Sequence, residues 1–435
     1  MLGIGCFLVP FSFHGQMNTA IGHLKEFLME YFYSDLGLLV VIICSAVFLI
    51  SLFIEVFKPD FIETNRALAR NIIGGYFWLS VRLASFLISI AVFTTSYDKH
   101  GLLLQYSQTI VLHTIPRLVI LVVVLSITAP LLLDYGLVQF ASVLASPIMR
   151  PLFKVPGRAA VDGMASWLGS SSMAVVLTAK MHERGYYNDR EAAIMIAAFS
   201  LPGIYNIYAI TDLFEMESYF MPILISVYVA AFILALILPR MWPLVYFPNT
   251  YHTGYDNFHK DIPDPQREYS LFERALVHAA NKARRMNMKS YLSESLALAM
   301  PLLFETIPLM IAFGTPLMLI AEWTPLVKIA AMPITRLFFH FGTMEPEMLS
   351  HATVFAFIDQ YLATAYGRAL FTGEARFLCI CLTTVGLINI TEIGIHVWHS
   401  SIPMKFWHLL AIYVIRIIIA AVILIPIAEY LFLIT

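Results

Sequence analysis

Charged residues are scarce in this chain, and their scarcity excludes most classes of soluble protein. Asp, Glu, Lys and Arg make up 13% of the 435 residues, while hydrophobic residues make up 59%. An ordinary soluble domain is about a quarter charged, and a soluble chain with this apolar excess would expose large adhesive patches. The composition therefore indicates a helical protein that crosses a lipid bilayer several times.

A basic excess, metal-binding motifs and catalytic motifs are also missing. The formal net charge is −2, so the sequence offers no basic face for nucleic acid. The four cysteines form no zinc-type Cys-x-x-Cys pair, and the thirteen histidines show no metal-ligand spacing. The sequence shows no nucleophile–base motif and no phosphate-binding Gly loop. We therefore expect no enzymatic activity, no cofactor and no metal.

A pattern of small and polar residues occurs twice inside apolar segments. The first copy is Gly203-Ile204-Tyr205-Asn206-Ile207, and the second is Gly386-Leu387-Ile388-Asn389-Ile390. Glu191-Ala192 precedes the first copy at the distance at which Glu374-Ala375 precedes the second. Glycine disfavours a helix interior, and polar backbone freed inside a membrane must be buried in protein or face a water-filled cavity. Each copy therefore predicts a broken transmembrane helix.

Apolar runs of about 20 residues, the length that crosses a bilayer, divide the chain into regions. Residues 1–35 are predicted to form an interfacial N-terminal arm, because their apolar start is too short to span. Residues 36–97 would form an N-terminal pair of transmembrane helices. The remaining regions are a first repeat at 115–240, a cytoplasmic linker with a surface helix at 241–292, and a second repeat at 293–435.

Residues 159–180 are only weakly hydrophobic, and their centre is rich in Gly and Ser. Basic residues flank this segment on both sides, within 150–158 and 180–190. A segment that enters and leaves the membrane on one face explains both basic flanks. Such a re-entrant hairpin is tolerated where it is buried in protein or lines a watery cavity. A second hairpin is expected within residues 355–370.

The distribution of Lys and Arg predicts the orientation in the membrane. The basic segments at 58–70, 150–190 and 240–290 fall on one face if the N-terminus lies outside, and that face would be the cytoplasmic side of the cell (inner) membrane. Each repeat then has an odd number of crossings, which inverts the second copy. The predicted fold class is an all-α polytopic membrane protein of about eight to ten spans. It has two inverted repeats with broken helices and re-entrant hairpins, the architecture of many secondary transporters.

The segment from Pro156 to Gly169, followed by Gly185-Tyr186-Tyr187 and Arg190-Glu191-Ala192-Ala193, resembles the YjiH-type membrane proteins of the nucleoside-recognition (Gate) domain family. The resemblance covers about residues 36–435, with a looser second copy that lacks the Gly-Ser-Ser-Ser tip. Families with this domain include nucleoside transporters, ferrous-iron permeases and spore-maturation proteins. The resemblance implies transport or gating and leaves the substrate open.

The hairpin tips and the broken helices supply the candidate substrate-binding residues. Unwound backbone and helix N-termini offer polar groups to a ligand. In the structural alternative, the glycines permit close helix packing, the asparagines bond to neighbouring helices, and the hydroxyls bond back to their own helix. The candidates are Gly169, Ser170, Ser171, Ser200, Gly203, Asn206, Asp359, Gln360, Thr383, Thr384, Gly386 and Asn389.

Two intramembrane carboxylates are candidates for ion coupling, since ionisable groups in a membrane are costly. Glu392 follows Asn389 by one helical turn, and Glu305 lies beside a proline. Arg82 and Arg416 are the expected counter-charges. The alternative is that these Glu–Arg pairs only lock helices together.

The sequence favours a secondary active transporter of a small polar organic solute, nucleoside-like, carboxylate or small peptide. It would use H⁺ or Na⁺ coupling and alternating access at the interface of the two repeats. Two alternatives stay open: a cation channel or permease, and a membrane protein that transports nothing and acts with a partner. We expect the lipid bilayer as its environment, a small-molecule solute and a coupling cation as partners, and no nucleic acid; a homodimer stays open.

Overall fold

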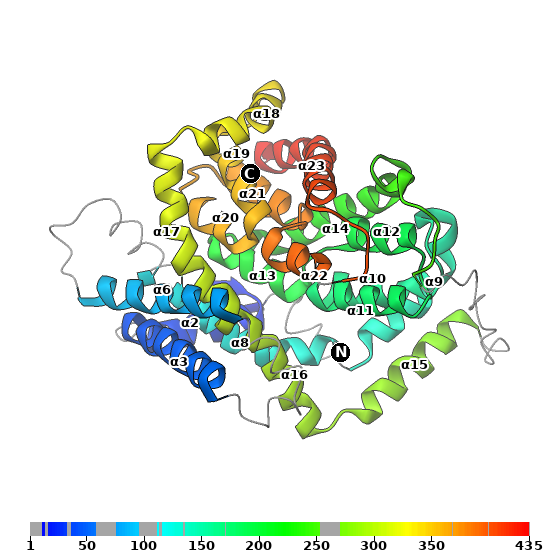
Figure 1. Cartoon of the computed structure of the whole chain (residues 1–435), viewed down its shortest axis with the longest axis horizontal. Coiled ribbons are helices and arrows are strands. Elements are labelled where there is room, and N and C mark those ends of the chain that lie inside the picture. Colours follow the sequence, from blue (N-terminus) through cyan, green and yellow to red (C-terminus); the bar gives the residue numbers. More distant parts are fainter. Residues whose placement is uncertain are drawn as a thin grey trace. The chain divides into compact units, whose positions relative to one another are not determined.

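A computed structural model describes residues 11–13, 16–32, 36–57, 75–94, 111–112, 115–133, 135–169, 171–252, 270–367, 369–398 and 400–434. The contacts divide the chain into two compact units. Unit 1 comprises Met1–Leu132 and Asn287–Ala330, and unit 2 comprises Leu133–Met286 and Ala331–Thr435. Both units are built almost entirely of helices, which confirms the predicted fold class (Figure 1).

Unit 1 consists of apolar helices and one short β-hairpin. The strands β1 (Phe11–Phe13) and β2 (Gln16–Asn18) pair antiparallel and precede α2 (Ala20–Phe32). The sequence analysis had not anticipated strands in this arm. The other elements are α3 (Leu36–Phe57), α6 (Gly75–Thr94), α8 (Ile115–Leu133), α16 (Met288–Pro301), η7 (Leu302–Thr306) and α17 (Ile307–Trp323).

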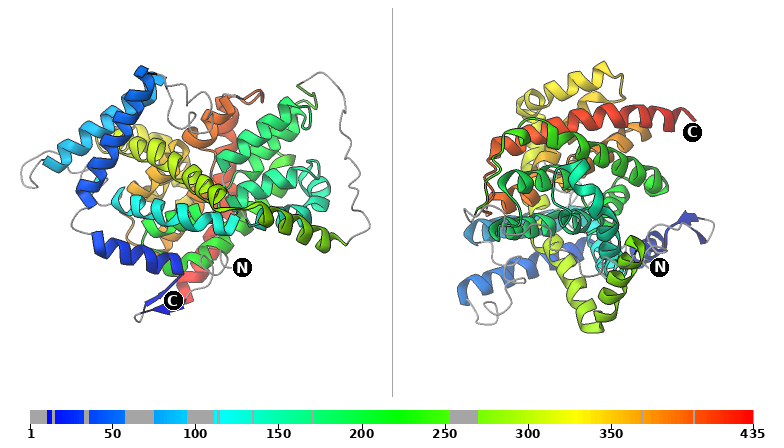
Figure 2. Two further views of the ribbon diagram at one scale, coloured as in Figure 1. Left: turned by 90° about the horizontal axis from the view of Figure 1, so that it is seen from below. Right: turned by 90° about the vertical axis from the view of Figure 1, so that its right-hand side faces the viewer.

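A buried arginine joins three elements of unit 1. α3 lies against α6 in both views of Figure 2, and α6 also packs against α17. Arg82 of α6 is 2% exposed; its Nε donates to the Phe304 carbonyl at 3.0 Å and its Nη1 to Ser51 Oγ at 3.0 Å. A buried guanidinium is costly unless its donors are satisfied. Arg82 therefore ties α3, α6 and η7 together.

Unit 2 begins with α9 (Leu137–Phe153) and the first predicted hairpin. That hairpin is formed by α10 (Ala159–Met164), the π-helical turn η3 (Ala165–Gly169) and α11 (Ser171–Glu183). Then follow α12 (Asp189–Phe199), α13 (Ile204–Leu213), η4 (Glu217–Tyr219), α14 (Phe220–Ile237), η5 (Leu238–Arg240), η6 (Leu244–Tyr246) and α15 (Leu271–Arg285).

The second half of the chain adds another hairpin and another broken helix. α18 (Leu326–His340) leads to the hairpin formed by α19 (Pro346–Ile358) and α20 (Gln360–Gly367), which pack against each other. The last elements are α21 (Gly373–Val385), the π-helical η8 (Ile390–Gly394), α22 (Ile395–Trp398) and α23 (Phe406–Ile434).

Six helical segments in the described part of the chain are long and apolar enough to cross a membrane. They are Gly37–Phe57, Gly75–Thr94, Asp189–Leu213, Glu217–Arg240, Met288–Gly314 and Phe406–Leu433. Two shorter apolar helices cover Ile115–Leu131 and Leu137–Phe153. The inverted relation of the repeats, the total number of spans and the orientation remain predictions.

The core of unit 2 is formed where α14, α21 and α23 pack on one another (Figure 1). Every residue of α21 from Phe377 to Val385 is buried, and α12 is buried from Ala192 to Phe199. A helix that is apolar on all sides is buried in protein or membrane. The helices on both sides of the first break and the helix before the second are therefore enclosed by the rest of the unit, and α13 is buried along its whole length.

The linker contains the helix α15 at Leu271–Arg285, which packs along α9, while its place on the membrane surface stays a prediction. Gly136 has a φ of 97°, and a Cβ at this position would lie 2.5 Å from the Ala279 carbonyl oxygen. Phe140 of α9 and Phe272 of α15 meet edge to face at 5.7 Å. Glycine thus allows the two helix backbones to approach closely.

Candidate functional site

The first repeated motif interrupts a helix at the predicted position. α12 ends at Phe199, residues 200–203 are not helical, and α13 starts at Ile204. Pro202 lacks an N–H for the helical ladder and disfavours helical backbone before it, and Ser200 is extended at φ −69° and ψ 108°. The break is buried throughout, so its polar backbone groups must find partners inside the protein.

The second motif also breaks a helix, with different local geometry. α21 ends at Val385, and Gly386 follows as its C-cap. Asn389 is 1% exposed, and its Oδ1 accepts the Ile393 N–H at 3.2 Å. This contact lies at the start of η8, where backbone N–H groups lack helical partners. Both interruptions anticipated from the sequence are therefore present.

One side chain joins the two breaks. Arg416 of α23 is fully buried; its Nη2 donates to the Ser200 carbonyl at 2.7 Å and its Nε to the Val385 carbonyl at 2.9 Å. It also donates to the carbonyl of Ala197. These carbonyls belong to the C-terminal ends of α12 and α21, where a helix carries partial negative charge. Arg416, expected to face a glutamate, thus caps both broken helices.

The tip of the first hairpin lies against the first break. A Cβ on Gly203 would come within 1.8 Å of the Gly169 carbonyl oxygen, so the two backbones are in direct contact. Ser166 Oγ exchanges hydrogen bonds with the Leu201 backbone at 3.3–3.4 Å. Ser171 is 1% exposed at the start of α11, and Ser170 lies outside the described residues. Only glycine fits at position 203 without moving the hairpin.

The tip of the second hairpin contacts both broken helices. Asp359 Oδ1 accepts the Tyr361 N–H at 2.8 Å at the start of α20, and its Oδ2 accepts Thr391 Oγ1 of η8 at 2.7 Å. The Tyr361 hydroxyl donates to Asn206 Oδ1 of α13. Asp359 therefore binds the helix after the second break, and Tyr361 binds the helix after the first.

Unit 2 contains most of the predicted substrate-site residues and places them on the broken helices and hairpin tips. Gln360 is 2% exposed, and Thr384 Oγ1 is buried without a hydrogen-bond partner among the described residues. Thr383 Oγ1 bonds back to the Cys379 carbonyl at 2.8 Å, as its structural alternative predicted. The side chain of Glu392 lies outside the described part, and Glu305 belongs to η7 in unit 1.

The sequence analysis did not select Asp162, which the structure places beside the first break. Asp162 is 2% exposed on α10, and its Oδ2 accepts the Tyr187 hydroxyl at 2.7 Å. Burial raises the pKa of Asp162 to about 6, although the Tyr187 hydrogen bond and the charge of Arg158 oppose this. A carboxylate within an otherwise apolar stretch of the hairpin was the sequence signal for this residue.

A small cavity lies between the first hairpin and α12. Its volume is about 10 Å³, which is about the space that one water needs. The polar residues of its wall are Asp162, Ser166, Thr178 and Ser200, and the others are Ala174, Val175, Met195, Ile196 and Phe199. Carboxylate and hydroxyl oxygens dominate the polar part of this wall, which suits a proton, a water or a small hard cation.

A hydrogen-bonded triad of serine, histidine and aspartate connects the end of α11 in the first hairpin to the segment before α23. His182 Nδ1 lies 2.9 Å from Ser401 Oγ, and its Nε2 lies 2.7 Å from Asp189 Oδ1. His182 is 0% exposed, so a substrate cannot reach the imidazole in this arrangement. The sequence did not reveal this triad because Ser401 lies 219 residues from His182 along the chain and the three residues follow no motif.

The fold and the spans together define the class: a multi-pass helical membrane protein. Residues 115–215 match the protein-family model described as Gate, nucleoside recognition. This match runs from α8 to α13, includes the first hairpin and the first break, and confirms the family resemblance read from the sequence. The closer relation to YjiH-type proteins and the second copy of the domain remain predictions.

The chain is also similar to an uncharacterized protein of Alkalihalophilus pseudofirmus. The two are 27% identical over 435 residues, which cover 99% of this chain and 93% of the relative. No solved structure matches the chain. The two proteins thus correspond along nearly their whole length.

Proposed function

We propose that unit 2 carries the solute site of a secondary active transporter, and that the solute is bound between the two hairpin tips and the two broken helices. The supporting observation is the convergence of both breaks on Arg416 and of the second hairpin on both helices after the breaks. Helices that are broken inside the protein let backbone groups and helix ends meet a ligand in many transporters. The match to the nucleoside-recognition family favours the same class.

The chemistry of the proposed site suits a small polar organic solute. Its side chains are mainly amides and hydroxyls, including Asn206, Gln360 and Thr384, and all three are buried. Uncharged donors and acceptors fit the hydroxyl, amide and ring-nitrogen groups of a nucleoside-like compound. The N-terminal ends of α13 and α20 would add affinity for a carboxylate, as in a small acid or a peptide.

Coupling to H⁺ or Na⁺ is part of the proposal. Asp162 is the best-described candidate, because its pKa of about 6 lies close to ambient pH and its cavity borders Ser200 at the first break. Glu392 stays a candidate by its position in η8, next to the second break. Glu305 stays an ion-coupling candidate within unit 1.

The test is thermal stabilisation of the purified full chain by nucleosides, amino acids, dipeptides and carboxylates, in Na⁺ and in K⁺ at two pH values. A ligand that binds only the native state raises the melting temperature in proportion to the logarithm of its concentration. We expect a graded shift with one solute class, lost in Asn206→Ala and Asn389→Ala and kept in the exposed control Asn281→Ala.

A flat panel with stable variants would contradict the transporter and favour a protein that acts with a partner. Uptake of a metal cation by vesicles holding the protein, without any effect of organic solutes, would favour the channel or permease.

A further inference from the structure

A second cavity of unit 2 is separate from the proposed solute site. Its volume is about 470 Å³, within the range of small-molecule sites. It opens between the C-terminal turn of α9 and the N-terminal turn of α12. The residues that line it are Arg150, Lys154, Asn188, Arg190, Glu191 and Asn249. None of them contacts the hairpin tips or the two breaks in the interactions described above.

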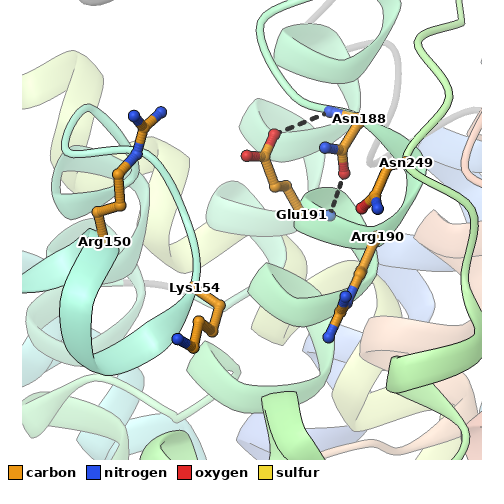
Figure 3. A pocket seen from close by; sticks show the side chains of 6 residues that line it. All are labelled: Arg150, Lys154, Asn188, Arg190, Glu191 and Asn249. Carbon is orange, nitrogen blue, oxygen red and sulfur yellow. Dashed lines mark hydrogen bonds between the residues drawn. The ribbon is translucent and has the colours of Figure 1, made fainter.

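Two basic side chains form one wall of this cavity. Arg150 and Lys154 stand one turn apart at the end of α9, and both are exposed. Lys154 is the C-cap and has a left-handed backbone at φ 62°, with its N–H donating to the Arg150 carbonyl at 3.3 Å. Figure 3 shows both side chains opposite the wall formed by α12 and Asn249. Like charges at this spacing repel one another, so the wall favours an anion.

The opposite wall adds a third cation and one carboxylate that is already engaged. Arg190 Nη2 donates to the Pro239 carbonyl at 3.3 Å, whereas its Nε is buried without a hydrogen-bond partner among the described residues. Glu191 Oε2 accepts the Asn188 N–H at 3.0 Å, and Asn188 Oδ1 accepts the Glu191 N–H at 2.8 Å (Figure 3). This capping box uses Glu191 to hold the helix start. The lining therefore carries three cations and one anion.

We propose that this cavity binds a phosphate-bearing anion, either the headgroup of an acidic phospholipid or a soluble phosphate compound. Two arginines and a lysine match the charge of phosphate, and a guanidinium can donate two parallel bonds to it. The side-chain amides of Asn188 and Asn249 offer further polar contacts to the oxygens or to an attached glycerol or sugar. An anion held between Arg150, Lys154 and Arg190 would tie α9 to α12. It would thereby stabilise the observed position of α12, the helix that leads into the first break, whichever solute is transported.

The experiment measures binding of two probes to the purified full chain. In a neutral detergent, inorganic phosphate is titrated against chloride at constant ionic strength, and the melting temperature is followed. In parallel, the protein is reconstituted into phosphatidylcholine vesicles with or without phosphatidylglycerol. A soluble ligand predicts stabilisation by phosphate in detergent, and a lipid headgroup predicts stabilisation only in vesicles that contain phosphatidylglycerol.

The variant Arg150→Gln/Lys154→Gln should weaken the apparent affinity for whichever probe binds by about tenfold or more, because it removes two charged donors of the cavity wall. The matched control Lys180→Gln/Arg184→Gln removes two exposed cations from α11 and its C-terminal end, outside the cavity, and should respond like the wild type. If the double variant does not fold, the exposed single change Lys154→Gln carries the same test.

Equal responses of variant and control, or no response to either probe, would overturn the proposal. Either outcome leaves the solute site untouched, since Asn206→Ala and Asn389→Ala report on that site alone.

Discussion

The two broken helices share one sequence pattern and solve the same problem in different ways. At the first break, Pro202 ends the helical ladder and Gly203 lies against the backbone of a hairpin tip. At the second, Gly386 closes α21 as a C-cap and Asn389 starts a π-helical turn. A repeated motif therefore determines where a helix stops, while the neighbouring elements decide what the freed backbone touches.

Each half also places one aspartate near its break, with different hydrogen-bond partners. Asp162 lies beside the first break, where burial raises its pKa, and its carboxylate accepts the Tyr187 hydroxyl. Asp359 accepts two backbone N–H groups and the Thr391 hydroxyl at the second. The raised pKa of Asp162 makes the first half a candidate place for proton movement.

The largest effect is expected at Arg416, which both breaks share. Arg416→Met should lower the free energy of unfolding by about 3–5 kcal/mol, because the carbonyls of Ser200 and Val385 lose a buried, charged donor. Arg416→Lys should recover only part of this loss, because an ammonium lacks the planar fork. Denaturation of the detergent-solubilised protein measures both variants. If Arg416→Met were as stable as the wild type, the two breaks would need no common cap.

Next comes the pair Gly203→Ala and Gly386→Ala. We expect Gly203→Ala to cost about 3 kcal/mol or more, since its Cβ would lie 1.8 Å from the Gly169 carbonyl oxygen. Gly386→Ala should cost less, because its Cβ would lie 2.7 Å from the Leu382 carbonyl oxygen and 2.8 Å from Ile417 Cδ1, both farther than the closest contact at Gly203. Melting temperatures of the two variants compare the breaks directly. Equal losses of stability would mean that the hairpin tip moves aside for the new methyl group as easily as the surroundings of Gly386 do.

Unfolding measured as a function of pH tests the raised pKa of Asp162. The pKa of Asp162 is raised from 3.8 to about 6 in the folded protein. The folded state therefore keeps a proton that the unfolded chain loses, and stability should fall as the pH rises from about 4 to about 6, by at most about 3 kcal/mol. Asp162→Asn should flatten this part of the profile. If the slope between these pH values survives in Asp162→Asn, another group causes it.

The smallest effect is expected at the link between the second hairpin and η8. Thr391→Val removes the hydroxyl that donates to Asp359 Oδ2 and should cost about 1 kcal/mol. Stabilisation by the solute should also weaken in this variant, because the hairpin tip loses its hydrogen bond to η8. The matched control is Thr324→Val, whose exposed hydroxyl only bonds back to its own helix at Ile320. If both variants respond to the solute alike, the hairpin tip is not part of the solute site.

The sequence predicted the elements of this protein well and their contacts poorly. The first span was expected at 36–57 and α3 covers Leu36–Phe57; both breaks and both hairpins were expected where they occur. Arg416 was expected as a counter-charge for a glutamate, which stays a prediction, and its bonds to two helix ends were not anticipated. The sequence did not indicate the role of Asp162 or the hydrogen-bonded triad of Ser401, His182 and Asp189. Their partners lie on other elements, and spacing along one chain does not show which elements meet.

Local chemistry explains what the sequence determined by itself. Long apolar runs require helices in a membrane, and Pro202 and the motif glycines end helices through missing donors and high backbone entropy. Only the tertiary structure decided that the ends of α12 and α21 converge on one guanidinium and that the second hairpin reaches both helices after the breaks. Buried polar groups must be satisfied by whatever lies beside them, and packing alone decides what that is.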